Sequence, residues 1–171
     1  MLGLVILFPF LLIVFLLGFF DTGSPLFIQK RVGIEKKPFN LIKFRTMSIE
    51  TKSVASHLAS SENITKLGRV LRKTKLDELP QLINVLLGSM SFVGPRPNLF
   101  NQLELINHRS QKGVYKVRPG ITGLAQIHNI DMSSPELLAK TDSEMIQGMS
   151  LANYFKYIMK TVTGSGSGDA I

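Results

Sequence analysis

The sequence contains no cysteine among its 171 residues. This absence excludes a disulfide framework and any metal site built from thiolates, and it fits a reducing compartment. The three histidines (His57, His108 and His128) share no metal-ligand spacing, so a zinc site is not expected either. The chain also lacks a Gly-x-Ser-x-Gly elbow and a Gly-Lys-Ser/Thr phosphate loop, and therefore shows no sign of a serine hydrolase or a P-loop enzyme.

Acidic residues are scarce between residues 30 and 75, where 12 Lys/Arg stand against 3 Asp/Glu. From residue 76 onward the chain holds 8 of each sign, so the net charge of +8 belongs to one segment. A localised positive field attracts phosphates, nucleic acid or an anionic lipid surface. A plain solvated basic face is the alternative interpretation.

The stretch Leu2–Phe20 has no charged and no hydrogen-bonding side chain. As one helix its 19 residues would be about 28 Å long, close to a bilayer core of roughly 30 Å, which favours a membrane segment over a buried core helix. A cleaved signal peptide is not expected, because Gly18–Asp21 offers no small-residue cleavage site. Pro9 kinks or breaks the helix, which either spans the bilayer or dips in and returns. The basic residues that follow place the remaining chain in the cytoplasm.

The remaining pattern predicts one compact α+β domain over residues 23–163, after an anchor at 1–22 and before a flexible Gly/Ser tail at 164–171. Two short strands form a hairpin, and residues 48–63 form a mobile loop or weak helix. The strands are expected at 26–29 and 39–44, the helices at 64–71, 77–87, 98–112, 135–145 and 150–159, and a further extended piece at 124–127.

Two adjacent carboxylates, Asp77 and Glu78, separate a basic run from an apolar run. Pro80 is tolerated only in the first turn of a helix, so it places a helix start near Asp77. Free N–H groups and the positive end of the helix dipole favour ionised carboxylates there. The pair is either a helix cap without chemistry or a nucleophile toward phosphorus, Asp77, beside an acid that helps to hold Mg²⁺.

Three arginines are candidates for binding phosphate. Arg72 precedes the two carboxylates and can neutralise phosphoryl oxygens. Arg96 stands between Pro95 and Pro97, whose fixed φ angles order it in advance and lower the entropy lost on clamping a phosphate. Arg45 is the third candidate, and for Arg96 and Arg45 a surface role is the alternative interpretation.

The order of these motifs resembles a known family, the bacterial sugar transferases, also called monotopic phosphoglycosyl transferases. Any one motif is weak, whereas six in collinear order over nearly the whole chain are specific. The matching pieces are Gln29–Gly33, Lys43–Met47, Leu67–Arg69 with Leu71–Arg72, Leu76–Leu82 with Asn84–Leu86, Met90–Pro97 and Pro119–Gln126.

The resemblance implies an enzyme that moves a sugar 1-phosphate from a UDP-sugar to polyprenyl (undecaprenyl) phosphate and releases UMP. It implies that Asp77 is the nucleophile that forms a covalent phosphosugar intermediate. Glu78 would complete the dyad, in which both carboxylates support Mg²⁺. The arginines expected to contact phosphates are Arg45, Arg72 and Arg96.

The resemblance also implies a re-entrant anchor broken at a proline, which would be Pro9, and amphipathic helices lying in the membrane interface. The protein would then sit in bacterial inner-membrane lipid with its catalytic domain on the cytoplasmic face. The reaction would be the first membrane step of glycoconjugate assembly, and an N-acetylated amino sugar is the expected substrate. One departure bears on that choice, because Ile127–Ile130 stands where the family often has Val-Asn-Gly-Arg.

Two other functions compete with this one. The first is a membrane-surface module that binds anionic lipid through residues 30–75 without catalysis. The second is a nucleic-acid binder, which is disfavoured because the basic segment lacks interleaved aromatic residues. Nucleic acid is therefore not an expected partner.

Overall fold

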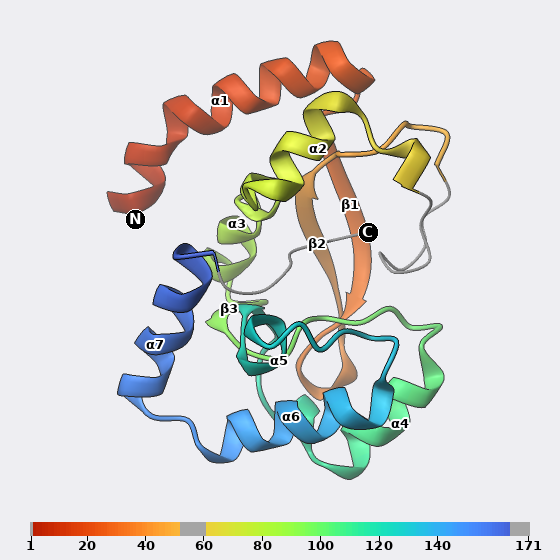
Figure 1. Cartoon of the computed structure of the whole chain (residues 1–171), viewed down its shortest axis with the longest axis vertical. Helices are drawn as coiled ribbons and strands as arrows, with labels where there is room; N and C mark the ends of the chain where they lie inside the picture. The colour runs from red at the N-terminus through yellow and green to blue at the C-terminus, as the bar shows by residue number, and fades with distance from the viewer. Residues whose placement is uncertain (1, 52–60, 165–171) are drawn as a thin grey trace. The chain divides into compact units, whose positions relative to one another are not determined.

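The computed structural model describes residues 2–51 and 61–164 (Figure 1). Helices and short strands alternate along the chain, which confirms the predicted α+β class. The chain divides into two compact units. Of the described residues, the first contains 2–29, 41–51 and 61–83, and the second contains 30–40 and 84–164.

The first unit begins with helix α1, Leu2–Thr22. Pro9 lies inside α1, and the helix continues through it, so the expected break is not confirmed. Large apolar side chains between Phe8 and Phe20 are exposed, and Phe20 reaches 85%. Among the helices that the structure describes, none combines the length and apolarity that crossing a membrane requires.

Strands β1, Leu26–Val32, and β2, Pro38–Phe44, pair as the predicted hairpin, and both are longer than expected. Their connection is too short for the crossover that parallel strands need, so the pair is antiparallel. The connection contains the 3₁₀ helix η1, Ile34–Lys36. Both strands start in one unit and end in the other.

Helix α2, Lys66–Lys73, follows the short 3₁₀ helix η3, Ser61–Asn63, in the first unit. Thr65 caps α2, because its Oγ1 accepts a hydrogen bond from the Gly68 N–H at 2.8 Å. A Cβ at Gly68 would lie 2.1 Å from the Thr46 carbonyl oxygen, so only glycine lets α2 approach the end of β2 this closely. The core of this unit consists of Val14, Phe44 and Leu71, with Leu11, Leu26, Leu67 and Leu76 packed around them.

The second unit is built on a small parallel sheet of β3, Ser91–Val93, and β4, Gly120–Thr122. Ser91 pairs with Gly120 and Val93 with Thr122. A Cβ at Gly120 would lie 2.0 Å from the Gly94 nitrogen, so glycine is required where β4 begins close to the residue that follows β3. The helical elements of this unit are α4 (Leu103–Gln111), η5 (Val114–Lys116), α5 (Leu124–Ile127), α6 (Pro135–Gln147) and α7 (Leu151–Val162).

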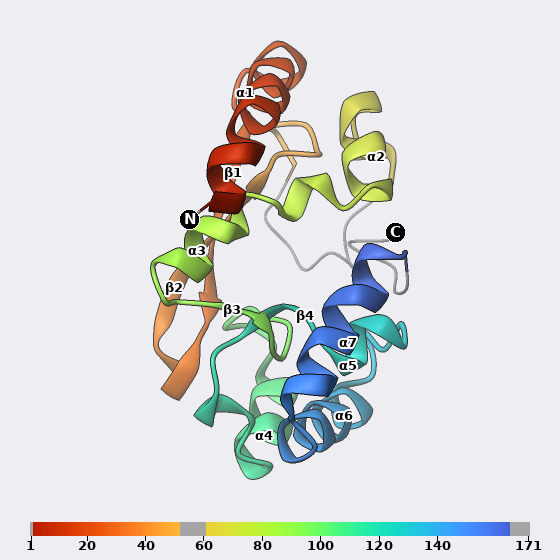
Figure 2. The ribbon, with the colours of Figure 1, turned by 90° about the vertical axis from the view of Figure 1, so that its left-hand side faces the viewer.

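Two apolar clusters hold these elements together, and Figure 2 shows α4, α6 and α7 gathered in one part of the second unit. One cluster joins β3 to α6 and α7, and the other joins α4 to α5 and α6. Their buried members are Val93, Met145 and Tyr157 in the first, and Leu105, Ala125 and Leu138 in the second.

The helices predicted at 64–71, 135–145 and 150–159 are confirmed as α2, α6 and α7. The helix predicted at 98–112 begins only at Leu103. The extended piece predicted at 124–127 is wrong, because burial of Ala125 against α4 and α6 favours the helical turn α5. Most of the loop predicted at 48–63, and the tail after residue 164, lie outside the described residues.

The helix predicted over residues 77–87 is divided in two. A 3₁₀ helix, η4, covers Leu76–Glu78, and α3 covers Gln81–Leu86. Pro80 has no N–H to give to a continuous helix, and the bonds around it span three residues instead of four. The Leu79 N–H donates to the Leu76 carbonyl at 3.2 Å, and the Leu82 N–H donates to the Leu79 carbonyl at 3.0 Å.

Candidate active site

The two adjacent carboxylates lie in η4, directly after α2. Lys75 links the two helices in a left-handed conformation, with φ 58° and ψ 16°. This conformation costs a non-glycine residue roughly 1–2 kcal/mol, and it turns the chain sharply at the end of α2. Asp77 is 1% exposed and Glu78 is 8% exposed. The turn therefore holds both acids inside the first unit.

Asp77 is not the N-cap residue of η4. Lys75 occupies the N-cap position of η4, and no side chain caps it. Asp77 lies inside the turn, because the left-handed Lys75 has already redirected the chain. Asp77 therefore does not cap the start of η4.

Two neighbouring buried acids repel each other when both are ionised, so they need positive charge close by. Mg²⁺ is commonly held by one or two carboxylates together with water and phosphate oxygens. Within residues 2–51 and 61–164, no group of three or more His, Cys, Asp or Glu side chains is arranged to hold a metal. The carboxylate oxygens of Asp77 and Glu78 therefore fit a Mg²⁺ that is also bound by a phosphate better than a Mg²⁺ bound by protein ligands alone.

Arg72 lies in the last turn of α2, next to this turn in the chain. Its Nε donates a hydrogen bond to Oγ1 of the buried Thr46 at 2.9 Å. The Lys75 N–H donates to the Arg72 carbonyl at 3.1 Å, which ties the left-handed residue to the arginine. Arg72 and the dyad are thus parts of one local structure.

Arg45 directly follows β2 in the same unit and bonds the backbone at the start of β1. Its Nε donates to the Ser24 carbonyl at 2.9 Å, and its Nη2 donates to the Leu26 carbonyl at 3.4 Å. The guanidinium also lies 5.4 Å from the centre of the Phe27 ring, within the range of a cation–π interaction. Its contact with a phosphate stays a prediction.

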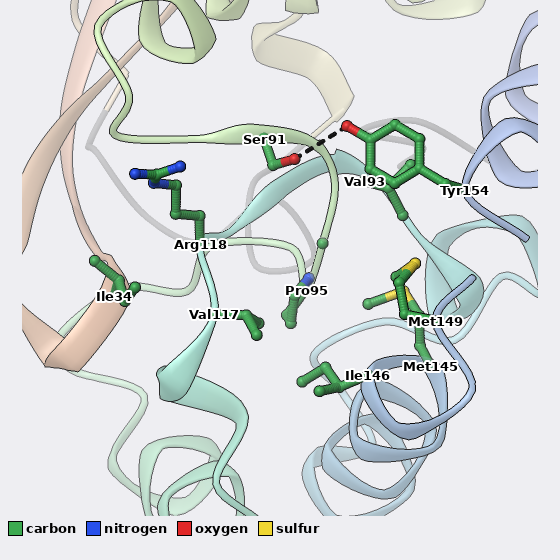
Figure 3. Close-up of a pocket in the computed structure, with 11 residues that line it drawn as sticks. Ile34, Ser91, Val93, Pro95, Val117, Arg118, Met145, Ile146, Met149 and Tyr154 are labelled. Carbon is green, nitrogen blue, oxygen red and sulfur yellow. Dashed lines mark hydrogen bonds between the residues drawn. The ribbon is translucent and has the colours of Figure 1, made fainter. Parts of the chain in front are cut away.

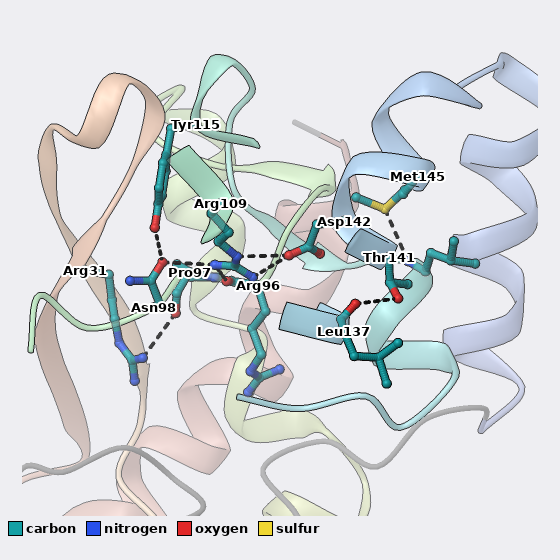
Figure 4. Close-up of polar contacts among 11 residues, drawn as sticks. Arg31, Arg96, Pro97, Asn98, Arg109, Tyr115, Leu137, Thr141, Asp142 and Met145 are labelled. Atoms are coloured by element: carbon teal, nitrogen blue, oxygen red, sulfur yellow. Dashed lines mark hydrogen bonds and ion pairs between the residues drawn. The ribbon is translucent and has the colours of Figure 1, made fainter. Parts of the chain in front are cut away.

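Arg96 belongs to the second unit, where its backbone is held between buried residues (Figure 4). Pro95 and Pro97 on either side are buried, whereas Arg96 itself is half-buried. The Arg109 Nη1 donates to the Arg96 carbonyl at 2.9 Å, and the Arg31 Nη1 donates to the Pro97 carbonyl at 3.1 Å. The chain bends at Gly94, and Pro95–Pro97 have no regular secondary structure. The contact of Arg96 with a phosphate stays a prediction.

A buried ion pair between Arg109 and Asp142 supports this turn and was not predicted. Nε and Nη2 of Arg109 donate to Oδ2 of Asp142 at 2.9 and 2.7 Å, and the two residues are 1% and 0% exposed. Burial raises the pKa of Asp142, and the charge of Arg109 opposes the rise. The sequence does carry a signal, because Asp142 falls between Leu138 and Met145 on the buried stripe of α6.

The second unit also contains a cavity of about 370 Å³ beside the start of the Arg96 turn (Figure 3). Val93, Val117, Met145 and Met149 contribute apolar surface, and the exposed Arg118 supplies a positive charge. At one side the hydroxyls of Ser91 and Tyr154 are 3.2 Å apart and share a hydrogen bond. The cavity is suited to an apolar or flat group attached to an anion.

Comparison of the sequence with known proteins identifies the family of this chain. The family model described as bacterial sugar transferase matches residues 1–166. The chain is similar to the uncharacterized sugar transferase EpsL of Bacillus subtilis, with 43% identity over 82% of this chain and 69% of that protein.

Two further relatives carry more specific names. The UDP-glucose:undecaprenyl-phosphate glucose-1-phosphate transferase of Caulobacter vibrioides is 37% identical over 83% of this chain and 57% of its own length. The exopolysaccharide production protein ExoY of Sinorhizobium fredii is 35% identical over 94% of this chain and 79% of its own length. Some relatives are much longer, and the chain spans only 38% of a sugar transferase of Haemophilus influenzae. From the family match and these identities, the chain belongs to the bacterial sugar transferase family.

Proposed function

We propose that the protein transfers a sugar 1-phosphate from a UDP-sugar to a polyprenyl phosphate such as undecaprenyl phosphate, and releases UMP. The observation that carries the proposal is the pair Asp77 and Glu78, both buried in one turn directly after the arginine at the end of α2. The name of the Caulobacter relative, a transferase of glucose 1-phosphate from UDP-glucose to undecaprenyl phosphate, supports the reaction class.

In the first step, a carboxylate oxygen of Asp77 attacks the β-phosphorus of the UDP-sugar. The bond from that phosphorus to the bridging oxygen breaks, and UMP leaves with the electron pair. The sugar phosphate remains on Asp77 as a mixed anhydride.

In the second step, a phosphate oxygen of the polyprenyl phosphate attacks the same phosphorus. The bond to Asp77 breaks and restores the carboxylate, and the product is a polyprenyl diphosphate sugar. Both nucleophiles are anions, so neither step needs a general base to remove a proton.

The phosphates bring negative charge that the site must balance. Arg72 and Arg96 would donate charge-assisted hydrogen bonds to phosphate oxygens, with Arg45 as a further cation. Asp77 and Glu78 would hold Mg²⁺, which neutralises charge on the diphosphate when bound.

A lipid-linked acceptor requires the protein to work at a membrane. The exposed apolar side chains of α1, such as Phe8, Ile13 and Phe20, support the proposal that α1 anchors the protein in the bacterial inner membrane. The cationic segment after α1 favours a catalytic domain on the cytoplasmic face, in contact with inner-membrane lipid.

The reaction is tested by measuring UMP release with Mg²⁺, undecaprenyl phosphate and each of UDP-glucose, UDP-galactose, UDP-N-acetylglucosamine and UDP-N-acetylgalactosamine. The relative is named for glucose, whereas the sequence predicts an N-acetylated amino sugar, so the panel decides between them. We expect release with at least one donor and loss of release when Mg²⁺ is chelated. Absence of release with every donor would contradict the proposed function.

The nucleophile is tested by leaving out the acceptor and measuring the mass of the intact protein. Wild type should gain one sugar phosphate, and Asp77→Asn should gain nothing and release no UMP. Glu136→Gln is the control, because it removes an exposed carboxylate of α6 and should behave as wild type. Full UMP release by Asp77→Asn would overturn the assignment.

A further inference from the structure

We propose that Asp142 and Arg109 are positioning residues for the transfer reaction, which act by fixing the backbone that carries Arg96. The inference rests on the proposed function, because it requires Arg96 to contact a substrate phosphate. It concerns two residues of α4 and α6 that do not themselves touch the substrate.

The turn that carries Arg96 cannot hold itself in place. Pro95 and Pro97 have no N–H, so the turn has few donors with which to bond its own carbonyls. Buried carbonyls need hydrogen bonds, and these must therefore come from elsewhere. The position of the Arg96 backbone therefore depends on which groups donate these hydrogen bonds.

Donors from other parts of the second unit reach four consecutive carbonyls of this turn. The backbone N–H of Gly120 donates to the Pro95 carbonyl at 3.0 Å, and that of Val32 donates to the Asn98 carbonyl at 2.9 Å. Between them, Arg109 donates to the Arg96 carbonyl at 2.9 Å and Arg31 donates to the Pro97 carbonyl at 3.1 Å. The carbonyl of Arg96 itself is thus held by the side chain of Arg109.

Asp142 determines the direction of the Arg109 side chain. Nε and Nη2 of Arg109 are both committed to Oδ2 of Asp142, which leaves Nη1 aimed at the turn. There Nη1 donates to the Arg96 carbonyl and, at 2.9 Å, to Oδ1 of Asn98. The Tyr115 hydroxyl donates to the same Oδ1 at 2.9 Å and fixes the amide of Asn98 (Figure 4).

Stability alone does not explain this arrangement. A buried ion pair can usually be replaced by well-packed apolar residues without loss of stability. Apolar residues could not donate to the Arg96 carbonyl, however, and the turn would lose the bond that orders it. An ordered Arg96 loses less entropy when it binds a phosphate, so loss of this order should lower the rate of transfer.

The test is a double-mutant cycle on kcat/KM for UMP release, with the most active UDP-sugar of the panel. Asp142→Asn should lower kcat/KM about tenfold in wild type, but less than about twofold when Arg96 is already alanine. Leu138→Ala is the control, because it destabilises the same helix without touching the network. All variants are assayed below the unfolding temperature of the least stable one.

The outcomes separate the hypotheses. If Asp142→Asn lowers kcat/KM by the same factor in wild type and in Arg96→Ala, the positioning role is wrong. It is also wrong if Arg96→Ala alone leaves kcat/KM unchanged. A wild type that releases no UMP would instead overturn the proposed function. If Asp142→Asn does not fold, Tyr115→Phe replaces it in the same cycle, with an expected loss of about threefold that vanishes in the Arg96→Ala background.

Discussion

Asp77 in the first unit and Asp142 in the second are both buried acids, but the chain surrounds them differently. Asp142 lies within a regular helix, and one arginine gives two N–H groups to one of its oxygens. Asp77 lies in a short 3₁₀ turn beside a second acid, Glu78, after a residue in a left-handed conformation. Asp142 thus lies opposite an arginine inside a helix, whereas Asp77 lies beside a second acid in the turn where we propose that Mg²⁺ and a substrate phosphate bind.

The difference extends to the backbone. The turn with Asp77 depends on one strained residue, Lys75, and strained conformations in native proteins cluster at functional sites. Among residues 94–98 around Arg96, none has a positive φ, and this backbone is held by hydrogen bonds from Arg31, Arg109 and two backbone N–H groups. The turn with Asp77 thus contains a residue in a disfavoured conformation, whereas the backbone around Arg96 is held by long-range hydrogen bonds.

The largest expected effect is on the activity of Asp77→Asn, which should be lost without a comparable loss of stability. Asp77→Asn should lower UMP release by on the order of 10⁴-fold, because the nucleophile is removed. Its free energy of unfolding should change by no more than about 1 kcal/mol, since the neutral amide has the same shape and removes a buried like charge. UMP assays and urea unfolding measure the two quantities. A large parallel loss of stability would show that Asp77 serves the fold, as Asp142 does.

The next largest effect is a loss of stability, and it concerns the ion pair between Arg109 and Asp142. Asp142→Leu alone should lower the free energy of unfolding by about 3–5 kcal/mol, because it leaves the charge of Arg109 buried without its partner. Arg109→Met combined with Asp142→Leu should recover most of that stability.

Activity should not return with that stability in the double variant. The carbonyl of Arg96 would still lack the donor that Arg109 supplies in wild type. Urea unfolding and UMP release on the same preparations measure both properties. Recovery of activity together with stability would show that the ion pair acts only by holding the fold.

The sequence predicted the features that depend on neighbouring residues. Asp77 and Glu78 are adjacent, Arg96 is flanked by two prolines, and the hairpin follows from two short apolar strands. These patterns are visible in a few residues, so their local structure could be anticipated without knowing the fold.

Features that depend on distant partners could not be predicted in this way. Arg109 and Asp142 are 33 residues apart, and nothing near either residue identifies the other. The turn α5 has few residues to indicate a helix and forms because Ala125 packs against α4 and α6. The left-handed conformation of Lys75, directly before η4, could not be predicted either, because local propensity disfavours it.

A smaller effect tests the strained turn itself. Lys75→Val should lower the free energy of unfolding by about 1–2 kcal/mol, because a β-branched residue fits the left-handed region poorly. Lys75→Gly is the matched control, because glycine adopts this conformation freely and should not destabilise the turn through its backbone. Urea unfolding of both variants measures the difference. Equal stability of the valine and glycine variants would show that Lys75 is not strained.

The smallest effect lies in the second unit and depends on pH. Burial raises the pKa of Tyr115 above its ordinary value of about 10, although the charge of Arg109 opposes the rise. As the pH rises past 10, the unfolded chain therefore loses this proton first and the folded protein binds more protons. The free energy of unfolding should then fall with rising pH, until the folded tyrosine also ionises. Urea unfolding between pH 9 and 11 should show a shallower fall for Tyr115→Phe than for wild type, and equal slopes would exclude this contribution.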